Sequence, residues 1–195
     1  KNKILYIIII IVSLLISKDR IAYIADVNGY VEILSENNNA PIVEAINGRY
    51  LYKGDLIRTF KNSNCVIMFH DQTSMFAIGS YSEVKVRDLK DNIKKINFNY
   101  GNLYLENISE NSPLFIFTRS SQILSKKSSG FVNTLTNGED EVFCIENKLE
   151  LYNKKSNLEV ALYADNKVLS LFDGTVELKK SEKNFIPDDL NAIIN

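Results

Sequence analysis

The stretch "INFNYGNLYLE" (residues 96–106) decides the fold, because apolar and polar residues alternate along it on both sides of a glycine. Ile96 and Phe98 would lie on one side of an extended chain, and Leu103 begins a second alternating run after Gly101. Alternation of this kind is typical of a half-buried β-strand. We therefore expect two strands that meet near Gly101.

Short apolar runs of the same kind recur along the chain, roughly every 8 to 12 residues, separated by Gly, Asn, Asp and Ser. Helix signals are nearly absent. This pattern predicts an all-β domain, either a compact β-sandwich or a short solenoid-like roll of many short strands. Asn28 and Gly29 suit a type I′ hairpin turn, since both residue types tolerate a positive φ. Cys65, Ile67 and Phe69 share one face of a strand that we expect to be covered on both sides.

We expect three segments: residues 1–19 as a signal peptide or membrane anchor, residues 20–180 as the all-β domain, and residues 181–195 as a tail. Apolar residues recur at helical spacing in the tail and follow Pro187, which predicts a short C-terminal helix. The polar stretch 119–130 is expected to be a loop with Gly130 as its flexible point.

Composition and charge exclude some classes of function. The chain has 195 residues, of which 45% are hydrophobic, and its 23 basic and 24 acidic residues give a formal net charge of -1. This suits one globular domain with a substantial core. The charges are scattered and form no basic stripe, so we expect no nucleic-acid binding.

An apolar segment follows a positively charged start. Lys1 and Lys3 precede residues 4–16, a run of about 13 residues that suits a signal-peptide core and is short for a membrane span of roughly 20. Leu15 stands where a cleavage site would have a small residue, so a cleaved signal peptide and an uncleaved anchor both stay open. Either one predicts a periplasmic or otherwise extracytoplasmic domain, with membrane contact only through this segment if it is uncleaved.

The sequence offers few tools for catalysis. Cys65 and Cys144 each share a strand face with apolar neighbours, which favours two buried free thiols over a disulfide. His70 is the only histidine, and its neighbour Asp71 would point to the opposite face of a strand, which argues against a His-Asp relay. No metal-ligand spacing, phosphate loop or nucleophile elbow is present. We expect no enzyme, no cofactor and no metal.

The segment "YLYKGDLIRT" (residues 50–59) places Gly54 and Asp55 in a corner between two apolar runs, followed by Arg58 and Thr59. Glycine supplies conformational freedom, and an aspartate in a turn accepts hydrogen bonds from nearby backbone N–H groups. A catalytic interpretation would need a base, which this stretch lacks. We interpret the four residues as a structural turn motif, with Arg58 paired either to Asp55 or to another carboxylate across the strand.

Several segments, including "NGYVEI", "YKGDLIRT", "SNCVIMFHDQTS", "IGSYSEVKV" and "NYGNLYLE", resemble the FecR-type extracytoplasmic domain family in order and spacing. The match is best over residues 24–105 and weaker to about residue 178. The chain departs from the family pattern at residues 71–73, where Asp-Gln-Thr replaces the usual Asp-Gly-Ser.

The resemblance implies a non-catalytic all-β module that binds and signals in the bacterial cell envelope, with another envelope protein as its partner. Regulators of this family carry a sigma-binding region before their membrane helix, and three residues precede the apolar run here, so we expect the module without that activity. A structural or glycan-binding envelope component is the alternative. Arg119, Lys126 and Lys127 in the expected loop are candidate contacts for an acidic partner surface.

Overall fold

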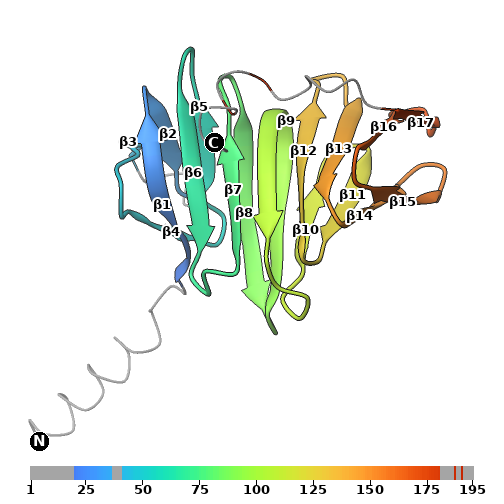
Figure 1. Ribbon diagram of the computed structural model, residues 1–195. Coiled ribbons are helices and arrows are strands. Elements are labelled where there is room, and N and C mark those ends of the chain that lie inside the picture. The colour runs from blue at the N-terminus through green and yellow to red at the C-terminus, as the bar shows by residue number, and fades with distance from the viewer. Residues whose placement is uncertain (1–19, 37–40, 181–186, 188–189, 191–195) are drawn as a thin grey trace, which may run out of the picture.

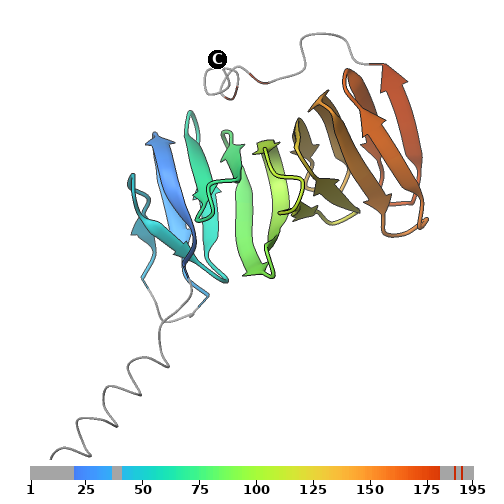
Figure 2. The same ribbon diagram turned by 60° about the horizontal axis from the view of Figure 1, so that its bottom comes forward.

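The computed structural model describes residues 20–36, 41–180, 187 and 190, and these form an all-β domain of 17 strands (Figure 1). The prediction of an all-β fold is confirmed. The strands progress from one end of the molecule to the other, so the first and last strands lie at opposite ends in both views (Figures 1 and 2). Two layers of strands pack face to face around a shared core, which makes the domain a short two-layered roll.

The two layers are defined by which strands pair. Sheet A contains, in order across the sheet, β4 (Tyr50–Tyr52), β1 (Arg20–Asn28), β6 (Asn64–Phe69), β7 (Ser74–Ile78), the second half of β9 (Ile93–Asn107), β12 (Ser128–Thr134), β13 (Asp140–Glu146), β16 (Asn166–Ser170) and β17 (Val176–Lys180). Sheet B contains β3 (Val43–Glu44), β2 (Val31–Leu34), β5 (Leu56–Thr59), β8 (Glu83–Lys90), the first half of β9, β10 (Leu114–Phe117), β11 (Ser121–Ser125), β14 (Lys148–Asn153) and β15 (Glu159–Tyr163).

Strand β9 joins the two sheets. Residues 93–100 pair with β8, and residues 94–97 also pair in parallel with β10. Residues 101–107 pair with β12, and residues 103–107 also pair with β7. Gly101 lies at the crossing with a φ of +106°, and a Cβ there would lie 2.1 Å from the Oγ of Ser82. The prediction of two strands meeting near Gly101 is therefore wrong in one respect: a single strand changes sheet at a position that only glycine suits.

The core lies between the two sheets and follows the period-two pattern of the sequence. Cys65, Ile67 and Phe69 of β6 are fully buried in it, as expected. The opposite side of β6 is covered only in part, since Val66 is buried, Met68 is half-buried and His70 is exposed. The outward side of sheet A is nevertheless apolar at several positions, and this surface is called the outer face of sheet A below.

The hairpin predicted at Asn28 and Gly29 is wrong. β1 belongs to sheet A and β2 to sheet B, so the dipeptide forms a corner between layers. Of the two residues, only Gly29 has a positive φ, of +74°. A Cβ on Gly29 would lie 2.5 Å from the Oγ of Ser63, which also accepts a 2.9 Å hydrogen bond from the N–H of Tyr30. This corner therefore requires a glycine, because the backbone at Gly29 lies too close to Ser63 for a side chain.

The loop predicted over residues 119–130 is also wrong, because β11 and the start of β12 occupy most of it. Buried serines take the place of apolar residues on the inward side of β11, where Ser121 and Ser125 flank Ile123. The Oγ of Ser121 donates to the Oγ of Ser170 at 2.9 Å, so the buried hydroxyl is satisfied. Gly130 is buried within β12, where an added Cβ would lie 2.6 Å from the carbonyl oxygen of Phe143.

Two predicted segments lie outside the described residues. These are residues 1–19 and, apart from Pro187 and Leu190, the tail 181–195 with its predicted helix. The first strand begins at Arg20 and the last ends at Lys180. Within the described ranges, no helical segment has the length and hydrophobicity needed to cross a bilayer.

Candidate functional site

The corner at Gly54 and Asp55 has the geometry of a turn that ties the two sheets together. Gly54 has a φ of +89°, and one carboxylate oxygen of Asp55 accepts a 2.9 Å hydrogen bond from the N–H of Tyr52. The N–H of Gly54 donates to the carbonyl of Val86, and the N–H of Val86 donates to the carbonyl of Asp55, both at 2.9 Å. Strand β4 of sheet A is thereby joined to β8 of sheet B.

Arg58 pairs with Glu83, which lies directly opposite it on β8. The Nη2 and Nε of Arg58 lie 2.7 Å and 2.9 Å from one oxygen of Glu83, and the amide of Asn99 donates to the other oxygen at 2.8 Å. The hydrogen bond to Glu83 raises the pKa of Arg58 further above its ordinary value. Arg58 is thus held by the cross-strand carboxylate of Glu83 and forms no hydrogen bond or ion pair with Asp55.

Thr59 is buried and bonds the backbone around Ser82. Its Oγ1 donates to the carbonyl of Gly79 at 2.6 Å and accepts from the N–H of Ser82 at 2.8 Å. The four motif residues Gly54, Asp55, Arg58 and Thr59 therefore occupy two places, the corner and the β5–β8 ladder. Neither place contains a general base beside a nucleophile, which catalysis of acyl transfer would require.

The three basic candidate contacts do not form one cluster. Arg119 precedes β11, and its guanidinium lies 4.4 Å from the centre of the Phe172 ring. Lys126 and Lys127 follow β11 in the turn to β12, with Lys127 at a φ of +43°. Because a strand rises about 3.3 Å per residue, Arg119 and Lys126 lie on the order of 20 Å apart. A single acidic partner group cannot engage all three.

The surroundings of Lys126 and Lys127 are mixed in charge. Both lysines line an open cavity of about 360 Å³ whose walls also include Glu110, Lys148 and Glu150. Lys148 is paired with Glu150 at 2.7 Å. Carboxylates thus interrupt the positive charge, so this part of the surface gives an acidic partner less attraction than the sequence suggested.

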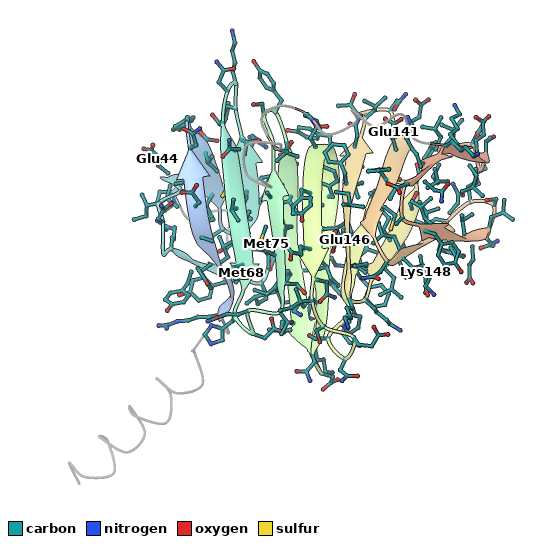
Figure 3. All side chains as sticks on the ribbon, in the orientation of Figure 1. Glu44, Met68, Met75, Glu141, Glu146 and Lys148 are labelled. Atoms are coloured by element: carbon teal, nitrogen blue, oxygen red, sulfur yellow. The ribbon has the colours of Figure 1, made fainter. Side chains whose placement is uncertain are left out.

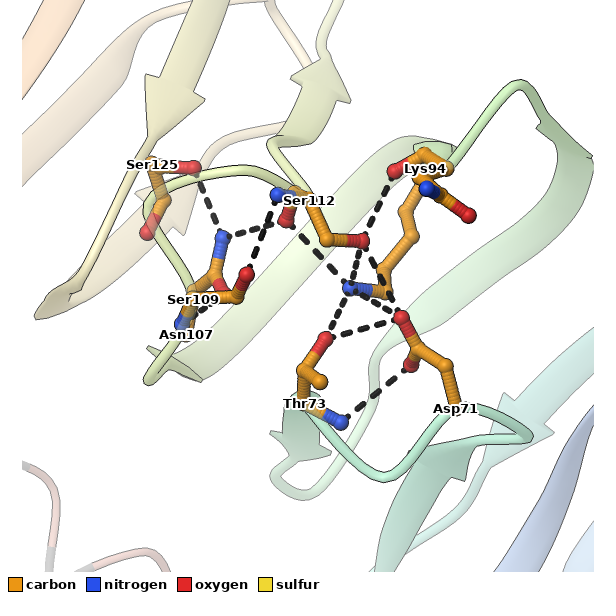
Figure 4. A network of polar contacts seen from close by, with 8 residues as sticks. Asp71, Thr73, Lys94, Asn107, Ser109, Ser112 and Ser125 are labelled. Atoms are coloured by element: carbon orange, nitrogen blue, oxygen red, sulfur yellow. Dashed lines mark hydrogen bonds and ion pairs between the residues drawn. The ribbon is translucent and has the colours of Figure 1, made fainter.

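A buried lysine that we did not predict forms the most elaborate polar cluster (Figure 4). Lys94, at the start of β9, has a fully buried side chain. Its Nζ lies 2.8 Å from a carboxylate oxygen of Asp71, 2.5 Å from the Oγ1 of Thr73 and 2.7 Å from the Oγ of Ser112. The cluster joins the β6–β7 turn, strand β9 and the segment before β10.

The charges in this cluster stabilise each other. Burial raises the pKa of Asp71, but the hydrogen bonds from Lys94 and Thr73 outweigh burial and bring that pKa below its ordinary value. Burial lowers the pKa of Lys94, and Asp71 opposes that shift. An ion pair of this kind keeps Lys94 an ammonium, which donates one hydrogen bond each to Asp71, Thr73 and Ser112.

The pairing of Lys94 with Ser112 invites comparison with a serine-lysine nucleophile. A base must be neutral to take the proton of a serine, and a lysine held by a carboxylate is charged. The Oγ of Ser112 is itself 2.7 Å from the carbonyl oxygen of Asn92 and is nearly buried. The arrangement therefore suits a structural tie between distant segments.

The neighbouring Asn107 extends the tie. Its side-chain amide donates to the carbonyls of Ser112 and Ser125, at 3.0 Å and 2.9 Å, and its oxygen accepts from the N–H of Ser109. Because these bonds use both amide protons and the side chain is buried, Asn107 holds the chain segments around it in place.

The remaining candidates are separated. His70 is exposed just after β6, and its neighbour Asp71 is committed to Lys94, so the two form no relay. Cys65 and Cys144 are buried free thiols, as predicted. Burial raises the pKa of Cys65 to about 12 and that of Cys144 to about 11, which leaves little thiolate at neutral pH. Within the described residues, no group of three or more His, Cys, Asp or Glu side chains could hold a metal ion.

Comparison with solved structures finds chains with a similar fold. Two crystal structures of a "putative anti-sigma factor" from Parabacteroides distasonis superpose on the chain with TM-scores of 0.58 and 0.57. Each has 12% sequence identity and a match that covers 65% of this chain and 60% of the other. At this identity the likeness is one of fold, and the matched region spans less than two thirds of those chains.

Sequence comparison adds no closer relative. No family model matches the chain, and no curated protein sequence matches it.

Proposed function

We propose that the chain is a non-catalytic, FecR-like binding and signalling module of the bacterial cell envelope. The observation that carries the proposal is the likeness of its two-layered roll to solved chains of a "putative anti-sigma factor". The sequence resemblance to FecR-type domains points the same way, and its residues fall on the strands and corners that build the roll. The partner would be another protein of the envelope.

The polar chemistry of the described residues supports binding over catalysis. Lys94, Asp71 and Ser112 satisfy one another, and the two thiols are buried and protonated. A non-enzymatic role needs no metal and no cofactor. Replacing His70 by Ala should therefore leave function intact, and abolition of a measured turnover by this change would contradict the proposal.

Cross-linking in the native envelope tests the proposed partner. A photoreactive residue placed at exposed positions of both sheets should capture a specific envelope protein, and the adduct should be absent when the domain is unfolded. Localisation is tested separately with protease added to spheroplasts, which should digest an extracytoplasmic domain before lysis. Protection until lysis would contradict export, and the absence of a specific adduct at every position would contradict binding to an envelope protein.

A contacting pair of aromatic rings and an exposed tyrosine bonded to it through the backbone favour the second candidate, glycan binding. Tyr30 and Phe60 contact with ring centres 5.1 Å apart, and the N–H of Tyr81 bonds the carbonyl of Phe60. Tyr30 is 47% exposed and Tyr81 is 60% exposed. Exposed aromatic rings of this kind suit sugar faces. Retention of the Tyr81→Ala variant on purified cell-wall glycan, compared with the Tyr163→Ala control, would measure this role.

A further inference from the structure

The outer face of sheet A carries a row of apolar side chains that lie directly opposite one another on five neighbouring strands. Since directly paired residues share a face of the sheet, the strand register alone defines this row. Its members, from β6 to β13, are Val66, Ala77, Tyr104, Phe131 and Phe143. Rows of this length on an outward face are unusual, because one side of an antiparallel sheet is commonly polar where it meets water.

Part of the row is covered by one residue from the end of the chain. Leu190 is fully buried and belongs to the same cluster as Val66, Ala77, Tyr104 and Phe131. Its N–H donates to the carbonyl of Pro187 at 3.0 Å. An aliphatic side chain delivered by a short segment thus fits this face well enough to lose all contact with solvent.

A second row beside the first consists of two methionines, two glutamates and one serine. It runs through Met68, Met75, Glu106, Ser129 and Glu146, again in direct register. Met68, Met75 and Glu146 are labelled in Figure 3. The methionines are half-buried and border a cavity of about 160 Å³. Methionine side chains adapt their shape to a ligand, which suits them to a binding surface.

The charge of this face is negative. Glu106 and Glu146 form no ion pair with any residue that the structure describes, whereas Lys167 at the end of the apolar row is paired with Glu141 at 2.6 Å. Burial, followed by the carboxylates of Glu106 and Glu146, raises the pKa of Tyr104 to about 12. Carboxylates without a cation beside an apolar row favour a ligand that brings both apolar and positively charged groups.

We propose that the outer face of sheet A is a docking face for an amphipathic partner segment that carries leucine-like side chains and lysines or arginines, and that Leu190 occupies this face until the partner binds. The proposal rests on the proposed binding function and names its surface and the chemistry of its partner. Two acidic residues, Asp188 and Asp189, precede Leu190 in the sequence, whereas a basic partner segment would bring positive charge to Glu106 and Glu146. Attraction to these two carboxylates therefore favours binding of the basic partner segment.

A synthetic peptide of leucine and lysine, about 14 residues long and amphipathic when helical, serves as the probe. Its binding to the full chain is measured by fluorescence anisotropy. Leu190→Ala should tighten binding roughly tenfold, because the covering leucine no longer competes for burial on the face. Leu178→Ala is the matched control, since Leu178 is 62% exposed on β17, and it should leave the affinity unchanged.

The charge of the face is tested with the double variant Glu106→Gln, Glu146→Gln. This variant should bind the leucine-lysine peptide more weakly, and its affinity for the peptide should depend less on salt concentration. The control Glu44→Gln, Glu159→Gln removes two exposed carboxylates from sheet B and should change neither. A leucine-glutamate peptide of the same pattern should fail to bind. All variants should keep the circular dichroism spectrum of the native chain.

Three results would overturn the proposal. The first is equal peptide affinity of the native chain and Leu190→Ala, and the second is unchanged peptide affinity of the Glu106, Glu146 double variant. The third is dimerisation of Leu190→Ala that depends on concentration and occurs without peptide binding, which would identify a second copy of the chain as the occupant. The proposed function fails separately. An envelope protein still captured by cross-linking while the peptide results fail would overturn this inference alone, and peptide binding with no captured protein would overturn the proposed envelope partner.

Discussion

At the scale of single residues, the roll is held by polar side chains buried in pairs. Lys94 and Asp71 are the clearest case, since the lysine has no exposure and its partner is partly open to water. A buried ion pair adds little net stability over apolar residues, but removal of one partner leaves a charge without compensation. The effect of a mutation at this site therefore depends on which partner remains.

Lys94→Met should lower the free energy of unfolding by about 2–3 kcal/mol, somewhat below the usual cost for a buried pair because the side chain of Asp71 is 29% exposed. Asp71→Asn in the same chain should recover part of the loss. Urea unfolding of both single variants and the double variant measures the coupling. Additive losses would mean that the two side chains do not act as a pair.

The acidic side of the stability profile should separate two aspartates. The folded pKa of Asp71 is lowered, so its contribution to stability is present above the unfolded value of about 3.9 and is lost as pH falls through the folded value. Burial raises the folded pKa of Asp140, despite hydrogen bonds from Thr118 and Thr134. The contribution of Asp140 to stability is therefore greatest at low pH and is lost as pH rises from the unfolded pKa of about 3.9 through the folded pKa.

Unfolding free energies should be measured from about pH 3 to about pH 7, the range in which these carboxyl groups titrate. The two aspartates should affect them with opposite trends. The stability of the native chain relative to Asp71→Asn should fall as pH is lowered, and that relative to Asp140→Asn should rise. Parallel trends would contradict at least one of the two assignments.

The corner at Gly54 should be more sensitive than its aspartate. Gly54→Val places a β-branched side chain at a φ of +89°, with its Cβ 2.5 Å from the Cβ of Glu36. Asp55→Ala removes one hydrogen bond, worth about 0.5–1.5 kcal/mol. Gly48→Val is the matched control, because Gly48 has a φ of +80° and no atom within 4 Å of the added Cβ. Thermal unfolding should give Gly54→Val a lower melting temperature than both other variants. Equal losses of melting temperature at Gly48 and Gly54 would assign the effect to backbone strain alone.

At the scale of elements, the sequence predicts the strands better than their partners. Period-two alternation identifies β6 and both halves of β9, because each needs only local residues. Pairing is non-local, and no local pattern predicts that β9 changes sheet at Gly101 or runs parallel to β10. The same rule explains the missed site: Lys94 has the parity of Ile96 and Phe98 and so points inward with them, but its polar character conceals this.

Strand β12 shows the limit of composition as a guide. Its serines and Gly130 predict a loop by composition, yet they lie in a strand that pairs with β9 on one side and β13 on the other. Gly130→Ala should then cost about 1–3 kcal/mol, because the new Cβ meets the backbone of Phe143 and the side chain of Leu149, both at 2.6 Å. Urea unfolding measures the loss. A neutral or stabilising effect of Gly130→Ala would restore the loop interpretation. Gly48→Ala is the control, because an added Cβ at Gly48 meets no atom within 4 Å.

At the scale of the whole molecule, the two-layered roll concentrates its core in the middle. The core cluster draws many residues from β5 to β9, whereas β15, β16 and β17 contribute few, of which Leu162 and Val168 are fully buried. The end strands are also largely exposed, with Leu178 on β17 at 62%. Local stability follows buried contacts, so it should decline toward the C-terminal end of the roll.

Native-state hydrogen exchange should show this decline. The amides of Leu103 and Leu105 in β9, which is paired on both sides, should exchange only by global unfolding, and those of Leu162 and Val176 should exchange through local opening at lower free energy. The reason is that β15 and β17 each pair with one neighbour among the described strands, so that opening exposes little core. Equal protection in β9 and in the C-terminal strands would mean that the roll unfolds as one unit. A partner docked on the middle of sheet A would then stabilise the end strands as much as the centre.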